Sequence, residues 1–393
     1  MEPFLSRTYD LAVVGAGILG LGHALAAARR RLRVVVVERD AQANGASVRN
    51  FGFVTVTGQE RGTTWRRALR TRDVWAEVAG PAGIAVEQRG LRVVVRRPEA
   101  LAVLEAYAAS EMGESCRLLN AAEAAEGLAG LPAAQLAGGL ASPHELRVES
   151  RSAVPRLAAW LAEAWGVDFL QPALVRAVAP PRLETTAGPL EAGAVVVCPG
   201  DEFLSLYPER IAGYGLSRCL LQMLRLRPRE AGFRLPCPVM SDLGLVRYAG
   251  YTALPEAAAL RARLEREQPR HLAEGVHLIA VAGADGTLVA GDSHRYAATP
   301  APFASAEVEA LILDELQRAT GLAEPEVLER WTGTYAWAPD RAALIDRPEA
   351  AVRLVVVTGG TGASTGFALG EEVVAELFDG AASAEASSPE PAE

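Results

Sequence analysis

The chain has 393 residues, of which half are hydrophobic and 22% are charged, and its formal net charge is −9. This length is more than one core usually organises, so two domains are expected. The composition is that of a globular protein, and the acidic balance argues against nucleic acid or an anionic membrane as the main partner. The apolar stretch 11–28 imitates a signal peptide, but Glu2 and Asp10 flank it wrongly, so we expect a cytoplasmic protein.

Lysine is absent, so all 39 basic residues are arginine. The chain therefore cannot use a Schiff-base or P-loop lysine, and guanidinium, histidine or backbone N–H groups must bind any anion. The four cysteines lie far apart without a C-x-x-C pair, and the five histidines form no H-x-x-x-H spacing. We therefore expect reduced thiols, no disulfide and no metal site.

A glycine motif stands near the N-terminus between two apolar runs. Tyr9–Val14 is predicted as a buried strand, Ile18–Arg30 as a helix, and Val34–Val37 as a second strand. The sequence GAGILG at 15–20 matches G-x-G-x-x-G at the turn before the helix, and Glu38 closes the second strand. This order of strand, glycine turn, helix and strand is typical of a dinucleotide-binding unit.

Each part of this motif has a physical role in such a unit. Gly15 permits the tight turn, Gly17 lets a pyrophosphate approach the backbone, and Gly20 lets helix and strand pack closely. The N–H groups at the start of the helix then bind the pyrophosphate, while Glu38 hydrogen-bonds a ribose hydroxyl. A carboxylate there would repel the 2′-phosphate of NADP. The alternative is a structural turn without a ligand.

The middle of the chain alternates between helical and strand patterns. Asn120 with Glu123 predicts a short capped helix. The other helices are expected at 59–78, 98–112 and 152–165, and the strands at 91–95, 173–178, 183–186 and 194–198.

Residues 215–296 are predicted to form a mostly antiparallel sheet. Its clearest signal is a hairpin in which Asp285-Gly286 joins the runs 276–282 and 288–291. Ser305 is placed as the N-cap of an amphipathic helix that ends at Thr320. Strands follow near 327–337, 342–346 and 354–357, then a last helix at about 364–378 and a low-complexity tail at 381–393 that is expected to be disordered.

A second glycine run, TGGTGASTG at 358–366, again lies between a strand and a helix. It can bring another helix N-terminus to one long cofactor, where its partial positive charge would suit the N1–C2=O edge of a reduced flavin. The run therefore favours FAD over NAD. The alternative is a flexible loop before a terminal helix.

With these two ends, the chain resembles the superfamily of FAD-dependent D-amino acid, glycine and sarcosine oxidases over nearly its whole length. The segments ASVRNFG at 46–52, SPHELR at 142–147 and GDSH at 291–294 resemble a subgroup associated with phosphonate breakdown. The resemblance implies oxidation of a small primary or N-methylated amine, and it includes aminophosphonates such as 2-aminoethylphosphonate or its N-methyl derivative. Hydride would pass to flavin N5, and the resulting imine would hydrolyse.

Carried over residue by residue, the resemblance places 46–52 where the chain passes from the pyrophosphate to the flavin ring, with Arg49 and Asn50 beside the reacting face. Related sarcosine oxidases use a lysine near the flavin to activate oxygen, and this chain has none, so O2 or another acceptor is left open. The expected FAD contacts are Gly15, Gly17, Ile18, Leu19, Gly20, Glu38, Arg39, Ala46, Ser47, Arg49, Asn50, Gly52, Val175, Pro199, Gly200, Gly360, Thr361, Gly362, Ser364 and Thr365.

Six side chains are candidates for the substrate site, each with a structural alternative. Arginines would bind an anionic group of the substrate, although a solvated strand face is the competing interpretation for two of them. The two histidines would tune or shuttle protons, or are structural. The tyrosine would line the pocket, or belongs to a core face. These candidates are Arg49, Arg218, Arg247, His144, His294 and Tyr335.

The expected fold is α/β, with two domains: a Rossmann-like FAD domain of the glutathione-reductase type and an interleaved substrate domain with an antiparallel sheet. Residues 1–58, 146–212 and 336–380 would form the FAD domain, and 59–145 and 213–335 the substrate domain. Two other interpretations are an NAD-dependent dehydrogenase, which would have no use for the second glycine run, and a non-catalytic flavin-binding protein.

Overall fold

A computed structural model of the chain describes residues 7–128 and 130–385. The chain divides into two compact units, each assembled from separate segments. Unit 1 comprises Met1–Ser47, Val154–Leu216 and Ala336–Glu393, and unit 2 comprises Val48–Ala153 and Ser217–Tyr335. Each unit has its own sheet, and the prediction of an α/β fold is confirmed.

Unit 1 is built on a sheet with the strand order β17-β18-β10-β1-β2-β7. The strands from β18 to β7 run parallel, and β17 pairs antiparallel with β18. All four valines of β2 are buried, as expected of a strand covered on both faces. The small strands β8 and β9 extend from β10. The bounds are β1 Thr8–Val14, β2 Val34–Val37, β7 Asp168–Leu170, β8 Val175–Ala179, β9 Arg182–Thr185, β10 Gly188–Val197, β17 Ala343–Glu349 and β18 Val352–Val357.

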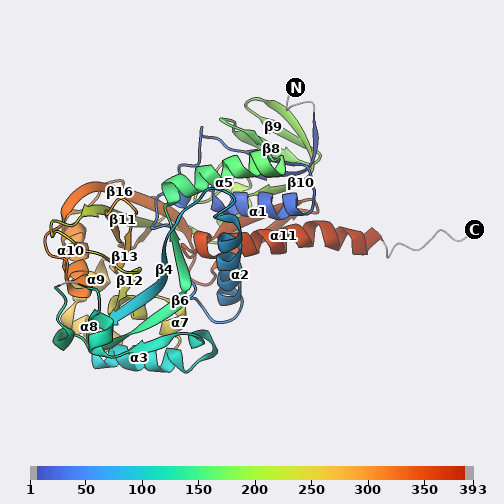
Figure 1. The fold of residues 1–393 in the computed structure, drawn as a ribbon. Helices are drawn as coiled ribbons and strands as arrows, with labels where there is room; N and C mark the ends of the chain where they lie inside the picture. Colours follow the sequence, from blue (N-terminus) through green and yellow to red (C-terminus); the bar gives the residue numbers. More distant parts are fainter. Residues whose placement is uncertain (1–6, 129, 386–393) are drawn as a thin grey trace, which may run out of the picture. The chain divides into compact units, whose positions relative to one another are not determined.

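Two helices of unit 1 lie side by side, α1 (Ile18–Arg29) and α11 (Gly362–Glu385) (Figure 1). Glycines permit their close approach, because a Cβ on Gly22 would lie 2.7 Å from the carbonyl oxygen of Gly366. The remaining helices associated with this unit are α5 (Ser150–Trp165), whose first residues belong to unit 2, and α6 (Pro208–Gly213).

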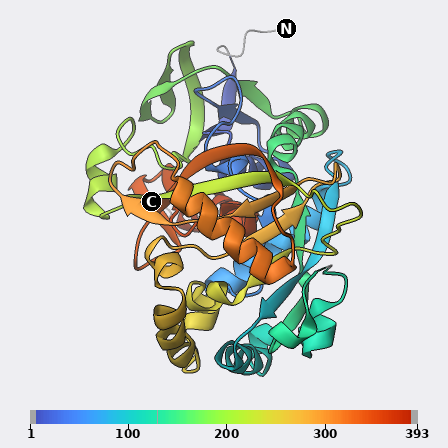
Figure 2. The same ribbon diagram turned by 90° about the vertical axis from the view of Figure 1, so that its left-hand side faces the viewer.

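Unit 2 is built on a larger, mostly antiparallel sheet with the strand order β15-β11-β14-β13-β12-β4-β6-β3, to which β16 and β5 are added. Helix α10 packs against β11, β12 and β14 of this sheet (Figure 2). The strands are β3 Phe53–Val54, β4 Val86–Val95, β5 Arg117–Leu119, β6 Gly138–Val148, β11 Ser217–Arg227, β12 Val239–Ser241, β13 Ile279–Ala282, β14 Leu288–Gly291, β15 Arg295–Ala297 and β16 Glu326–Trp337. The helices are α2 Thr63–Val78, α3 Pro98–Ala108, α4 Ala121–Ala125, α7 Ala249–Thr252, α8 Ala257–Glu267, α9 Pro269–Ala273 and α10 Ala306–Thr320.

The capping signals of the sequence are confirmed. The Asn120 side chain accepts a hydrogen bond from the backbone N–H of Glu123, and the Glu123 carboxylate accepts one from that of Asn120. Ser305 caps α10 by accepting from Val308 N–H. Four orphan N–H groups begin every helix, so these side chains fix where the two helices start.

Two predictions for the chain were wrong in part. Residues 242–273, expected within a sheet, form a 3₁₀ turn at Asp242–Val246 followed by α7, α8 and α9. Residues 381–385 of the expected disordered tail continue helix α11, since their alanines favour helix, and residues 386–393 lie outside the described residues. None of the helices among the described residues is long and apolar enough to cross a bilayer.

Candidate active site

The glycine turn of unit 1 has the geometry that its motif requires. Gly15 has a φ of 105°, and a Cβ there would lie 2.5 Å from the carbonyl oxygen of Cys198. A Cβ on Gly20 would lie 1.9 Å from the carbonyl oxygen of Gly15. Only glycine fits either place, so the backbone turns tightly between β1 and α1, and the N-cap residue Gly17 has no side chain of its own to cap the helix.

Glu38 fixes this turn from the end of β2. Its buried carboxylate accepts hydrogen bonds from the backbone N–H of Ala16, at 2.7 Å, and from that of Asp40, at 3.0 Å. Each carboxylate oxygen retains acceptor capacity for a ribose hydroxyl. Ser47 lies at the helix N-terminus, where its hydroxyl accepts from Ile18 N–H at 2.9 Å.

A cavity of about 160 Å³ opens beside the turn within unit 1. Its walls come from the glycine turn, the end of β2, the loop 39–47, the start of β8 and the loop after β10. The predicted cofactor residues that line it are Gly15, Gly17, Glu38, Arg39, Ala46, Ser47, Val175, Pro199 and Gly200. Residues far apart in sequence thus meet where a dinucleotide was expected.

The second glycine run reaches the same end of unit 1. A Cβ on Gly362, the first residue of α11, would lie 3.6 Å from the side chain of Ile18, the first residue of α1. The two helix N-termini are therefore neighbours, and both offer backbone N–H groups to an anionic or electron-rich ligand. The hydroxyl of Thr361 is buried without a hydrogen-bond partner in this structure, which leaves a polar group free for a ligand.

A second group of polar side chains gathers in unit 2, at the end of the β13–β14 hairpin. Arg247 donates to the hydroxyl of Tyr335 at 3.4 Å, and the Tyr335 ring lies 6.4 Å from that of His294. The ring of His277 lies 4.5 Å from that of His294. Asp292 stands between the two histidines, with its oxygens 3.4 Å from His277 Nδ1 and 3.8 Å from His294 Nε2.

A family model described as FAD-dependent oxidoreductase (DAO) matches residues 10–377, which is almost the whole chain. The chain belongs to the DAO family. It is therefore an FAD-dependent oxidoreductase, and the residues of unit 1 fit that cofactor through the glycine turn, the Glu38 carboxylate and the unpartnered Thr361 hydroxyl.

Solved structures share the fold of this DAO-family member over nearly their full lengths. Glycine oxidase from Geobacillus kaustophilus is 20% identical, with a TM-score of 0.73 and 95% of each chain covered. L-proline dehydrogenase from P. horikoshii is 18% identical, with a TM-score of 0.75, covering 95% of this chain and 94% of its own. Iminodiacetate oxidase from Chelativorans sp. BNC1 is 18% identical, with a TM-score of 0.68 and coverage of 98% and 96%. No curated protein sequence matches the chain.

Burial sets the protonation of the unit 2 group in this DAO-family protein. It raises the pKa of Asp292 to about 8, against a weaker opposing effect of Arg247. Burial, and then the charge of Arg247, lowers the pKa of His277 to about 3. The pKa of His294 is lowered well below its usual value by burial, by His277 and by Arg247. At neutral pH the two imidazoles are thus uncharged, and Arg247 is the cation of the group.

The other substrate-site candidates lie elsewhere in unit 2. Arg218 donates to the carbonyl oxygen of Ala298 at 2.5 Å, and it precedes Cys219, whose side chain contacts Tyr335. Successive strand residues point to opposite faces, so Arg218 faces away from the Arg247 group. His144 contacts the carbonyl oxygen of Glu114 at 3.0 Å. The backbone of Arg49 accepts a hydrogen bond from the indole of Trp331 in β16.

The SPHELR segment at 142–147 makes hydrogen bonds that hold the residues after Arg49 in place. The Glu145 carboxylate accepts hydrogen bonds from the N–H groups of Val56 and Thr57, at 3.2 and 2.8 Å. The fully buried Arg147 donates to the carbonyl oxygen of Phe51 at 3.3 Å. Ser142 accepts from the Thr57 hydroxyl. This segment therefore fixes the backbone of 51–57, directly after the stretch expected beside the flavin.

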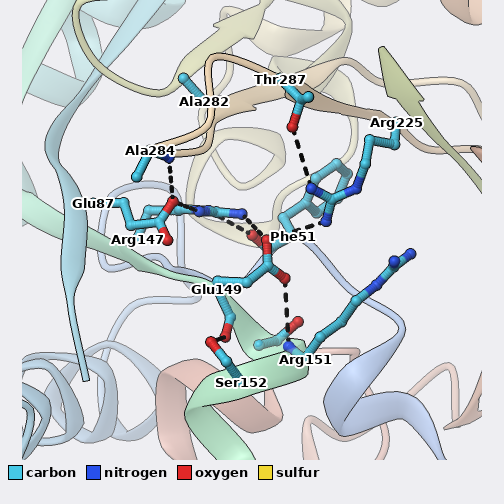
Figure 3. Close-up of polar contacts among 12 residues, drawn as sticks. Phe51, Glu87, Arg147, Glu149, Arg151, Ser152, Arg225, Ala282, Ala284 and Thr287 are labelled. Carbon is cyan, nitrogen blue, oxygen red and sulfur yellow. Dashed lines mark hydrogen bonds and ion pairs between the residues drawn. The ribbon is translucent and has the colours of Figure 1, made fainter. Parts of the chain in front are cut away.

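Arg147 also anchors a network of two arginines and two glutamates (Figure 3). It pairs with Glu87 of β4 and, at 2.8 Å, with Glu149. Glu149 is shared with Arg225 of β11, at 3.1 Å, and Arg225 donates to the hydroxyl of Thr287 in the hairpin. The two arginines neutralise the two glutamates. The network links β4, β6, β11 and the β13–β14 hairpin.

Three members of the polar group around Arg247 in unit 2 were missed from the sequence, namely His277, Asp292 and Tyr248. The hairpin itself was predicted, and its strands continue far enough to set His277 against Asp292 and His294. The hairpin pairs Ile279 with Gly291, so extending this register would set Leu278 opposite Asp292, and the observed pairing of His277 with Asp292 is shifted by one residue. Tyr248 could not be found from the hairpin either, because it reaches His277 from the helical segment before α7.

Proposed function

We propose that this flavoenzyme oxidises the C–N bond of a small amine that carries an anionic group, and that the substrate is an aminophosphonate such as 2-aminoethylphosphonate or its N-methyl derivative. The observation that carries the proposal is the lack of a carboxylate partner for the Arg247 guanidinium. Its Nε is buried without a hydrogen-bond partner, and no carboxylate among the described residues lies within 4 Å of its guanidinium. A guanidinium in such surroundings favours an anion from solution.

Phosphonate matches this place better than an uncharged group would. It carries up to two negative charges and three acceptor oxygens, so its burial needs several donors. Arg247 supplies the charge and a planar set of N–H groups, and Tyr335 adds a hydroxyl within 3.4 Å of it. The GDSH segment, which resembles the phosphonate subgroup, contributes Asp292 and His294 to the same group.

FAD, when bound, would supply the two-electron oxidising capacity for the C–N bond of the uncharged amine. The chain's own residues bind and orient the reactants. Glu38 and the helix N-termini of unit 1 hold the dinucleotide, and Arg247 holds the anionic end of the substrate. The cofactor is proposed to be non-covalently held. The electron acceptor is left open between O2 and another oxidant. The chain has no lysine of the kind that related sarcosine oxidases use to activate oxygen.

The second candidate is a D-amino acid, glycine or sarcosine type of oxidation, in which a carboxylate would take the place of the phosphonate on Arg247. It is supported by fold likeness to glycine oxidase and iminodiacetate oxidase. A non-catalytic flavin protein is disfavoured by the buried Nε of Arg247, because a buried N–H group without a hydrogen-bond partner is costly unless it binds something.

An anaerobic screen tests these candidates. Purified yellow protein is mixed with 2-aminoethylphosphonate, N-methyl-2-aminoethylphosphonate, glycine, sarcosine or D-alanine, and the loss of flavin colour is followed. We expect the aminophosphonates to bleach the flavin fastest. Faster bleaching by the carboxylates, with inert aminophosphonates, would assign the second candidate. Failure of every amine, including uncharged alkylamines, would reject amine oxidation.

A further inference from the structure

We propose that His277, Asp292 and His294 form a binding site for one divalent transition-metal ion, and we take Zn2+ as the ion to test. The site goes beyond the proposed amine oxidation and does not depend on it. One carboxylate and two imidazoles are ligands that suit such an ion, whereas Mg2+ and Ca2+ prefer oxygen alone.

The three side chains already converge. Their ligand atoms all lie within 4.8 Å of one another, and all three residues are buried. Asp292 is 3.4 Å from His277 Nδ1 and 3.8 Å from His294 Nε2. Ligands about 2.0–2.2 Å from a tetrahedral zinc ion lie roughly 3.3–3.5 Å apart, so only small rotations would close the set around an ion.

The outer contacts of both histidines leave the correct nitrogens free. His294 Nδ1 is bonded to the carbonyl oxygen of Gly275 at 3.0 Å, which makes that nitrogen the N–H donor and turns Nε2 toward Asp292. His277 Nε2 is bonded to the Tyr248 hydroxyl at 3.2 Å, and its Nδ1 faces Asp292. Metal-binding histidines are commonly fixed in this way, with one ring nitrogen held by a protein oxygen and the other on the metal.

The facing atoms lack other partners. His277 Nδ1 and Asp292 Oδ1 are buried and accept or donate no hydrogen bond in this structure. An unpartnered buried polar atom costs free energy, so a native protein normally satisfies it. A cation between these atoms would satisfy both at once. It would also offset the cost of holding the Asp292 carboxylate ionised in a buried place.

Arg247 opposes the ion, because it adds a second positive charge nearby. Burial is the main cause of the lowered pKa values of His277 and His294, and the charge of Arg247 lowers both further. The three protein ligands leave a fourth position open, and an anion there would balance the charge. We therefore expect moderate zinc affinity that increases when inorganic phosphate or methylphosphonate is present.

The test uses the full-length FAD-loaded protein without a histidine tag. Metal content is measured after dialysis against Zn2+, and Co2+ is added to chelator-treated protein as an absorbing substitute. We expect one zinc ion per chain and Co2+ bands at wavelengths longer than those of the flavin. Asp292→Asn, His277→Gln and His294→Gln should each abolish both signals, while Tyr248→Phe should weaken zinc affinity about 10–100-fold, as losses of outer contacts do.

The matched control is His271→Gln, since His271 also faces a carboxylate, that of Asp314 at 3.2 Å, but lies outside the cluster. It should keep the metal. Flavin content and circular dichroism check folding, and Asp292→Ala replaces Asp292→Asn if the latter does not fold. Wild-type protein that retains its flavin and takes up no Zn2+ or Co2+, or cluster variants that bind the ion as well as wild type does, would overturn the proposal. Neither outcome bears on amine oxidation, which the anaerobic screen measures separately.

Discussion

The main chains of His277 and Asp292 exchange two hydrogen bonds of 3.3 Å each, so these two residues lie opposite one another at the open end of the hairpin. This pairing sets the imidazole of His277 beside the Asp292 carboxylate, and the next residue but one, His294, points to the same side. A local hydrogen-bond register thus creates a polar group from residues about one hairpin length apart in sequence. Arg247 and Tyr335 complete it from other elements.

The first prediction concerns the cofactor. Gly17→Val should release FAD, because a Cβ at this position would already lie 3.0 Å from Ser47 Oγ and the branched side chain would fill the space that a pyrophosphate needs. The measurement is the ratio of flavin to protein absorbance after gel filtration. Acid treatment of wild-type protein should release the flavin, as expected of a non-covalent cofactor.

The same substitution at a harmless place provides the control. Gly193→Val in β10 of unit 1 places its Cβ in ordinary contact, 3.5 Å from the carbonyl oxygen of Asp10, and should retain flavin. A Gly17→Val protein that folds and remains fully yellow would refute the assigned role of the glycine turn. Flavin that stays on the unfolded wild-type chain would instead point to a covalent link.

The second prediction concerns the anionic group of the substrate. Arg247→Ala should lower kcat/KM for the best aminophosphonate. The loss corresponds to a rise of about 2–5 kcal/mol in activation free energy, the cost of losing one partner of a buried charge pair. Arg247→Lys should recover only part of it, because lysine cannot make the bidentate fork. Tyr335→Phe should cost about 0.5–1.5 kcal/mol, as expected for one hydrogen bond.

Arg227→Ala is the matched control. Arg227 pairs with Glu326 at 3.0 Å on the surface of unit 2 and should not affect kcat/KM. The effect of Arg247→Ala should be much smaller for an uncharged amine than for an aminophosphonate. Equal losses on both kinds of amine would show that Arg247 supports the structure and does not bind the anion.

The sequence was sufficient for much of unit 1. The glycine turn, Glu38 and the second glycine run each have a local signal, since a specific backbone geometry demands glycine and an acid at fixed spacing. The same is true of the Ser305 cap and the β13–β14 hairpin. In each case the residues that create the structure are close together in the chain.

The helical segment around Arg247 and the polar group in unit 2 depend on contacts between residues that are distant in sequence. Leu245–Tyr251 has the valine and tyrosine content of a strand, yet it is helical in part, and Gly250 N–H bonds to the carbonyl oxygen of Gly58 at 3.0 Å. Arg218 and Arg247 gave similar signals, and only the fold shows that Arg247 joins Tyr335 and His294. Side-chain neighbours across a sheet cannot be deduced from spacing along one strand.

The third prediction concerns the network around Arg147. Arg147→Ala should lower the free energy of unfolding of the protein by about 3–5 kcal/mol, since it leaves the carboxylates of Glu87 and Glu149 with less compensation in a largely buried place. Adding Glu87→Gln to Arg147→Ala should restore part of the loss, because one uncompensated charge is removed. Urea unfolding followed by circular dichroism measures both.

Arg151→Ala is the comparison for this network. Arg151 pairs with Glu329 at 2.6 Å, but both side chains are about 40% or more exposed, and such pairs contribute at most about 1 kcal/mol. A loss for Arg147→Ala no larger than that for Arg151→Ala would contradict the interpretation. It would mean that water reaches the two carboxylates when the guanidinium is removed.

The last prediction is a pH dependence in unit 1. Asp346 accepts two hydrogen bonds from Arg210, at 2.5 and 2.7 Å, and one from the Tyr214 hydroxyl at 2.8 Å. The Arg210 contact is the main cause that lowers the pKa of Asp346 to about 2. In the unfolded chain the pKa of an aspartate is about 3.9. The folded state therefore favours the ionised form, and the stabilisation is present above pH of about 4 and is lost as the pH falls through about 2.

Asp346→Asn should accordingly lower the free energy of unfolding at neutral pH by about 1.5 kcal/mol, the lower end for hydrogen bonds to a charged group, because Arg210 is partly exposed. The difference between wild type and variant should shrink as the pH is lowered from about 5 toward 2, since wild-type Asp346 becomes protonated. Asp340→Asn, at a surface carboxylate paired with Arg341, should show a much smaller difference at every pH. A wild-type advantage that stays constant, or grows, on acidification would mean that the Asp346 carboxylate does not contribute through its charge.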